Sequence, residues 1–178
     1  MLPFATRGRS YFESKLGARF SRMIAREVSA EWPRATVQDA DRLPASFRQR
    51  GARALGVGEV IGDADAAGIG EALGADYLVV GEIHELRGKD PKSFGVLQGT
   101  MVVSARLVDV ERGRVVWQLS RHAFHYPPPI SGGELVPARE KDEAEVVRKV
   151  MLEAARGIAV PFTGRELTTG ERVERAVY

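Results

Sequence analysis

Apolar residues in four segments recur every three or four positions, a pattern typical of helices that bury one face. The pattern is clearest over residues 12–30 and 140–159, where the apolar positions form a continuous stripe. Ser10 is placed to cap the first of these helices, and Trp32 and Pro33 end it. Two shorter helices are predicted, at residues 43–54 and 63–74.

Five other segments have the composition or the alternation of strands. Residues 96–110 alternate regularly, with apolar side chains such as Met101 on one face and polar ones such as Ser104 mostly on the other. Residues 115–126 follow after a short turn, in which Gly113 can adopt the positive φ of a hairpin. The remaining strands are predicted at residues 1–5, 35–38 and 77–86.

The resulting order, β-α-β-α-α-β-β-β-α, predicts an α+β fold. We expect a mixed sheet of about five strands that ends in an antiparallel meander, with the helices packed mainly on one face. With 178 residues, of which 44% are hydrophobic, the chain is long enough to bury one core. Residues 1–162 are therefore predicted to form a single domain, and residues 163–178 a polar C-terminal tail. No apolar run is long enough to predict a membrane-spanning helix.

Glycines are concentrated over residues 56–70 and could indicate a phosphate-binding loop. A dinucleotide site needs G-x-G-x-x-G directly after a buried strand, whereas this stretch reads G-x-G-x-x-x-G after the basic sequence RQRGARAL. We therefore expect loop and helix-end glycines and no cofactor, with Gly74 ending a helix and Gly81 marking a bulge or a close backbone approach. The alternative is a cytosolic nucleotide-binding regulator or enzyme that uses residues 56–70.

The residue types that carry catalysis or bind metals give little support for an enzyme. The chain has no cysteine, which excludes thiol chemistry and cysteine-ligated metals. His122 and His125 fall on opposite faces of a strand, whereas Glu82 and His84 could share one face and bind a metal with a third ligand. The competing interpretation is surface histidines, and we predict no metal. No serine lies in G-x-S-x-G and no acid pair is recognisable, so no catalytic residue is predicted.

A basic stripe is the candidate partner-binding site. Its members recur at steps of four, three and four, which places them on one helix face. The stripe predicts docking of an acidic partner or of anionic headgroups, and the alternative is a solvated helix face. Residues 1–62 carry 11 basic and 6 acidic side chains, whereas residues 63–178 carry 15 and 18. The net charge of +2 does not indicate nucleic-acid binding. The stripe consists of Lys15, Arg19, Arg22 and Arg26.

Two longer stretches resemble the paired signature of a bacterial envelope-lipoprotein superfamily. The first is DAAGIGEALGADYLVVGEI, residues 65–83, and the second is VVSARLVDVERGRVVW, residues 102–117. In that group a short helix ends in a Gly-Ala-Asp turn into a strand that ends in glycine, and a later strand carries ARLVD, a turn with glycine, and VVW. The opening MLPF is similar to the group's first strand. The group includes the LpoB-type activators of penicillin-binding proteins and the curli-secretion protein CsgG.

The resemblance implies a fold related to the N-terminal domain of TolB. It also implies a non-enzymatic envelope accessory domain that acts by protein–protein contact in cell-wall synthesis or secretion. Its partner would be another envelope protein or, in a homo-oligomeric ring, further copies of itself. The implied location is the periplasm or the outer membrane, reached through a signal peptide and a lipidated cysteine upstream of Met1, with no other membrane contact.

Overall fold

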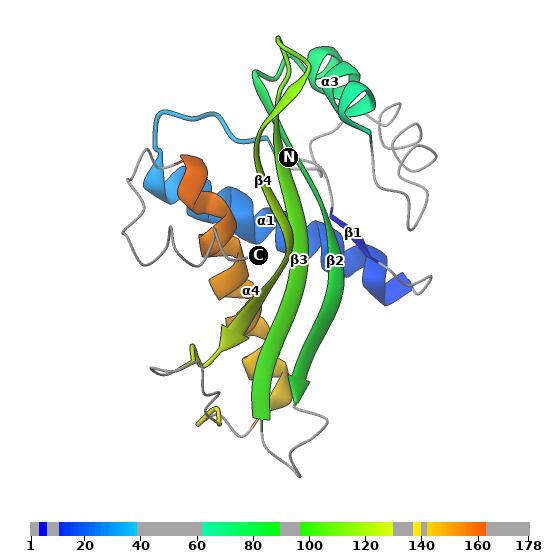
Figure 1. Cartoon of the computed structure of the whole chain (residues 1–178). Helices are drawn as coiled ribbons and strands as arrows, with labels where there is room; N and C mark the ends of the chain where they lie inside the picture. The colour runs from blue at the N-terminus through cyan, green and yellow to red at the C-terminus, as the bar shows by residue number, and fades with distance from the viewer. Residues whose placement is uncertain are drawn as a thin grey trace.

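The sheet has four strands in the order β1-β2-β3-β4 (Figure 1). β2 (Tyr77–Lys89), β3 (Leu97–Asp109) and β4 (Arg114–Tyr126) form an antiparallel meander, and the short β1 (Ala5–Thr6) pairs in parallel with β2. The mixed sheet and its final meander are as predicted. This computed structural model describes residues 4–6, 11–38, 62–89, 97–129, 137–139 and 142–162.

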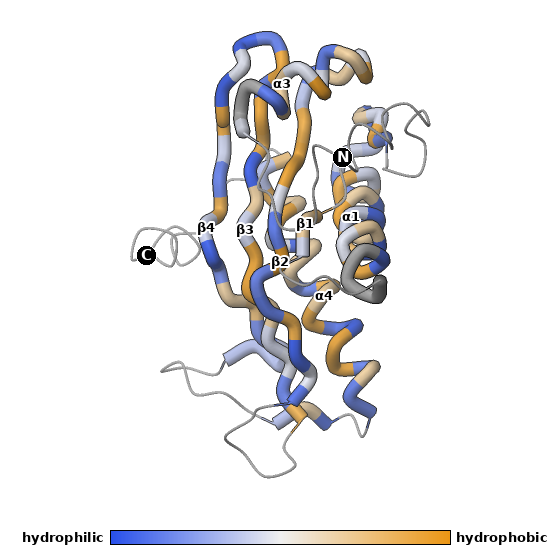
Figure 2. Tube along the Cα trace, turned by 90° about the vertical axis from the view of Figure 1, so that its right-hand side faces the viewer, coloured by the Kyte–Doolittle hydropathy of each residue, from blue (hydrophilic) through white to orange (hydrophobic). Residues whose placement is uncertain are grey.

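Three helices cover the sheet in the described part of the chain. α1 (Tyr11–Glu31) and α4 (Glu143–Ala159) lie together on one face, and a 3-10 turn (Val160–Phe162) follows α4. α3 (Asp63–Ala72) packs on the other face, at the end of the sheet where β2 begins (Figures 1 and 2). None of these helices is both long enough and apolar enough to cross a membrane.

One predicted strand is wrong. Residues 35–38 form no strand, because the chain turns after α1, where the backbone N–H of Ala35 donates to the carbonyl of Trp32 at 3.0 Å. Val37 then packs against the core as a single apolar side chain, and this packing does not require strand pairing. The described part of the chain therefore holds four strands rather than five. The predicted helix at residues 43–54 and the tail at residues 163–178 lie outside the described residues, and the single domain stays a prediction.

Two apolar clusters lie on the two faces of the sheet. Val79 and Ile83 of β2 face α1 and α4, whereas Leu78 and Val80 face α3. Successive side chains of a strand point to opposite faces, so the apolar run at the start of β2 is buried on both sides. The larger cluster holds the fully buried side chains that join the two long helices to the sheet, Phe20, Ile24, Met101, Val103, Met151 and Ile158.

Phe4 joins α1, β1 and β2 through contacts that two glycines permit. Its ring packs edge-on against Phe20 at 5.1 Å between centroids. A Cβ at Gly81 would overlap the Phe4 ring and lie 2.5 Å from the carbonyl oxygen of Ser104. A Cβ at Gly17 would overlap the Phe4 carbonyl. The predicted close backbone approach at Gly81 is thus confirmed.

The two predicted glycine turns are also confirmed. Gly74 has φ of +62° directly after the C-terminal end of α3, and Gly113 has φ of +58° in the turn between β3 and β4. Side chains other than glycine rarely adopt this left-handed conformation.

Candidate functional site

A groove between α1 and α4 gathers most of the predicted basic stripe. It has a volume of about 360 Å³ and includes two apolar side chains, Met23 and Leu152. Arg148 of α4 lines it from the side opposite α1. Lys15 is exposed nearer the start of α1 and is not among the lining residues. The α1 residues that give the groove its charge are Arg19, Arg22, Arg26 and Glu27.

The orientation of α1 follows from its apolar spacing. Phe20, Ile24 and Val28 are buried against the sheet and α4. Arg19 and Arg26 therefore point away from the core, and both are exposed. Among the described residues, neither of these two guanidinium groups forms an ion pair. The stripe is thus a helix face beside a second helix, rather than an isolated convex surface.

The acidic residue that lines the groove is already neutralised. Glu27 lies 3.4 Å from the guanidinium of Arg156 on α4, which also bonds to Glu153 at 3.2 Å. Arg148 lies 3.9 Å from Glu145, close to the limit of an ion pair, and its side chain is half exposed. The four arginines that line the groove outnumber its single acidic residue, so the groove keeps a net positive charge.

Arg148 is a site residue that the sequence did not single out. Helical spacing groups residues within one helix, but it does not show which helices lie side by side. The contact between α1 and α4 brings Arg148 to the stripe, and only the tertiary structure shows that contact.

A second polar cluster joins β2 and β3, and it adds Ser104 to the predicted pair of Glu82 and His84. His84 Nε2 lies 2.7 Å from Ser104 Oγ, and His84 Nδ1 lies 3.6 Å from Glu82 Oε2. This order of groups is that of a hydrolase triad. The side chains of His84 and Glu82 are only 7% and 11% exposed, and Ser104 Oγ also accepts the backbone N–H of Arg121. The cluster therefore links the neighbouring strands β2, β3 and β4 through polar contacts.

The other two histidines lie on opposite sides of β4, as predicted. His122 packs edge-on against Phe124, whereas His125 Nδ1 is 3.3 Å from Thr100 Oγ1. Burial lowers the pKa of His125, and the nearby positive charge of Arg87 adds to the effect. Glu82 and His84 do share one face, but no group of three potential metal ligands occurs in the described part of the chain.

The described part of the glycine-rich stretch is helical. Gly68 and Gly70 lie inside α3, and a Cβ at Gly70 would overlap the side chain of Val110. Gly70 therefore allows α3 to approach the sheet closely. Residues 56–61 lie outside the described residues.

No protein-family model matches this sequence, and comparison with curated proteins gave no match. Among solved structures, a PelC dodecamer from Paraburkholderia phytofirmans is similar, with 16% identity, a TM-score of 0.54, and coverage of 92% of this chain and 86% of that chain. The lipoprotein GNA1162 from Neisseria meningitidis matches with 14% identity, a TM-score of 0.49, and coverage of 89% and 95%. Because PelC is only 16% identical to this chain, the similarity between them shows a shared fold alone. Membership of the envelope-lipoprotein superfamily, including kinship with LpoB-type activators or CsgG, stays a prediction.

Proposed function

We propose that this chain is a non-enzymatic accessory domain of the bacterial envelope that acts by protein–protein contact through the groove between α1 and α4. The observation that carries the proposal is the grouping of four arginines with two apolar side chains in one groove. The arginines are Arg19, Arg22, Arg26 and Arg148. The lipoprotein-like sequence signature supports a place in the periplasm or at the outer membrane. A lipid anchor upstream of Met1 would attach the domain to the membrane.

The chemistry of the groove favours a protein partner with carboxylate side chains. Guanidinium groups bind carboxylates in a planar, two-pronged geometry, and arginine is enriched where proteins meet. Met23 and Leu152 add apolar surface to the groove, on which an apolar side chain of the partner can be buried. The partner segment is therefore acidic, with small or apolar residues between its charges.

We also propose that the domain associates with further copies of itself. The observation that favours this is the PelC chain, which has the same fold and is described as a dodecamer.

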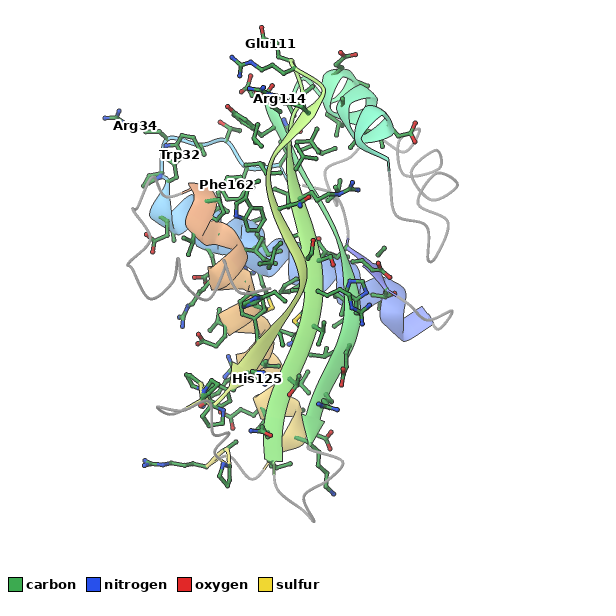
Figure 3. All side chains as sticks on the ribbon, viewed as in Figure 1. Trp32, Arg34, Glu111, Arg114, His125 and Phe162 are labelled. Carbon is green, nitrogen blue, oxygen red and sulfur yellow. The ribbon has the colours of Figure 1, made fainter. Side chains whose placement is uncertain are left out.

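Capture of partners from an envelope extract tests the groove. Wild type is compared with Arg19→Glu/Arg26→Glu, and we expect the variant to bind the partner at least about tenfold less well, because reversed charges face the partner's acids. The control is Arg34→Glu/Lys89→Glu, which makes the same change of charge at two exposed residues outside the groove. Figure 3 shows that the Arg34 side chain extends away from the helices. Unchanged capture by the groove variant, or equal loss in the control, contradicts the proposal.

A further inference from the structure

The outer surface of α3 carries acidic side chains and small residues. No lysine or arginine occurs between Gly62 and Tyr77. Asp65 and Glu71 are exposed, and no described residue forms an ion pair with either of them. The exposed residues Gly68 and Ala72 share this surface, and nothing lies within 4 Å of the position of a Cβ at Gly68. Small residues of this kind let another surface come close to the helix backbone.

The acidic surface and the basic groove belong to different faces of the molecule. α3 covers Leu78 and Val108 on one side of the sheet, whereas α1 and α4 cover Val79 and Met101 on the other. Figures 1 and 2 show α3 at one end of the sheet, away from the place where α1 and α4 meet. Within one molecule the two surfaces therefore do not meet, and two sets of opposite charges remain exposed.

We propose that α3 of one copy docks into the groove between α1 and α4 of the next copy, so that copies associate head to tail. This rests on the groove being a protein-binding site, as proposed above, and it names the partner. In this contact the carboxylates of Asp65 and Glu71 meet the guanidinium groups of Arg19 and Arg26. None of these four side chains forms an ion pair with a described residue of its own chain. When two copies meet through two different surfaces, one of each kind is left unused on the pair. Further copies can therefore add, which generates rings or open filaments.

The arrangement of the exposed residues along α3 suits this position. Its ten residues make a helix of about 15 Å, and helices pack at about 8–10 Å between their axes. Asp65, Gly68 and Ala72 are three and four residues apart and so form one ridge, with Glu71 beside it. A helix surface that combines small residues with two acids complements a groove that combines two apolar side chains with arginines.

Charge reversal on each surface separately tests the contact by sedimentation velocity of the full chain. One variant is Arg19→Glu/Arg26→Glu in the groove, and the other is Asp65→Lys/Glu71→Lys on α3. We expect wild type to form oligomers and each variant alone to associate at least about tenfold more weakly. An equimolar mixture of the two variants should assemble again, because each reversed surface then meets a reversed surface on the other variant. That recovery cannot come from misfolded protein.

Salt and a matched control complete the test. Raising the salt from about 0.1 M to about 1 M shortens the screening length from about 10 Å to about 3 Å, so the wild-type assembly should weaken. The control Arg34→Glu/Lys89→Glu should sediment as wild type does. A monomeric wild type, unchanged association of either variant, or failure of the mixture to assemble overturns the inference. If the groove variant loses an envelope partner other than this chain while its self-association is unchanged, the inference fails and the proposed function stands.

Discussion

Gly17→Ala tests the contact that holds α1 against β1. In the middle of a helix this change would ordinarily stabilise the protein by about 1 kcal/mol, because alanine favours the helix more than glycine does. At Gly17, however, the new Cβ would overlap the carbonyl oxygen of Phe4 and lie 3.0 Å from its carbon. Phe4 has little room to move, since its ring is packed between Phe20 and Gly81.

The expected size of the effect follows from these opposing terms. Forcing an extra methyl group into a packed contact costs about 1–3 kcal/mol, and a clash with backbone favours the upper part of that range. After subtraction of the helix-propensity gain, Gly17→Ala should lower the free energy of unfolding by about 1–2 kcal/mol. For a chain of this size that lowers the melting temperature by about 2–8 °C.

Gly68→Ala is the matched control, because it also lies inside a helix but no atom lies within 4 Å of its new Cβ. It should raise the free energy of unfolding by about 0.5–1 kcal/mol. The assay is denaturant unfolding followed by circular dichroism, in about 1 M salt to weaken the proposed assembly. The two substitutions should therefore have opposite signs. If Gly17→Ala stabilises the protein as much as Gly68→Ala does, Phe4 does not lie against Gly17 and the reasoning is wrong.

Two further predictions concern Asp109, at the end of β3, and Gly74, in the turn between α3 and β2. Asp109 accepts the backbone N–H of Arg112 at 2.9 Å and its guanidinium at 2.7 Å, which holds the pKa of Asp109 below its usual value of 3.8. Since the unfolded chain then binds the proton more readily, this stabilisation is present above the unfolded pKa and is lost as the pH falls through the folded pKa. Asp109→Asn should thus be less stable than wild type near neutral pH, and the difference in thermal unfolding should shrink in acid. A difference that is constant with pH would contradict this. Gly74→Ala should cost about 1–2 kcal/mol because its φ is +62°, whereas Gly74→Asn should cost less; equal losses in denaturant unfolding would show that backbone strain is not the cause.

Local patterns in the sequence correctly predicted most of the described elements. Apolar periodicity marks α1 and α4, alternation marks β3, and strand-like composition marks β2 and β4. Gly74 and Gly113 were correctly assigned because a positive φ is a local backbone requirement. Gly81 meets a different requirement, the close approach of the Phe4 ring and the Ser104 carbonyl. The failure at residues 35–38 has a physical reason: a strand exists only where it pairs, and one apolar residue such as Val37 can be buried without pairing.

The sequence by itself determined that Arg19, Arg22 and Arg26 share a helix face, because helical geometry fixes which residues are neighbours three and four positions apart. The tertiary structure alone decided that this face borders a groove, because Arg148 reaches it through the packing of α4 on α1. Strand register likewise paired Glu82 with Ser104 across β2 and β3. Contacts between elements depend on how whole faces pack, which no spacing within a single element specifies.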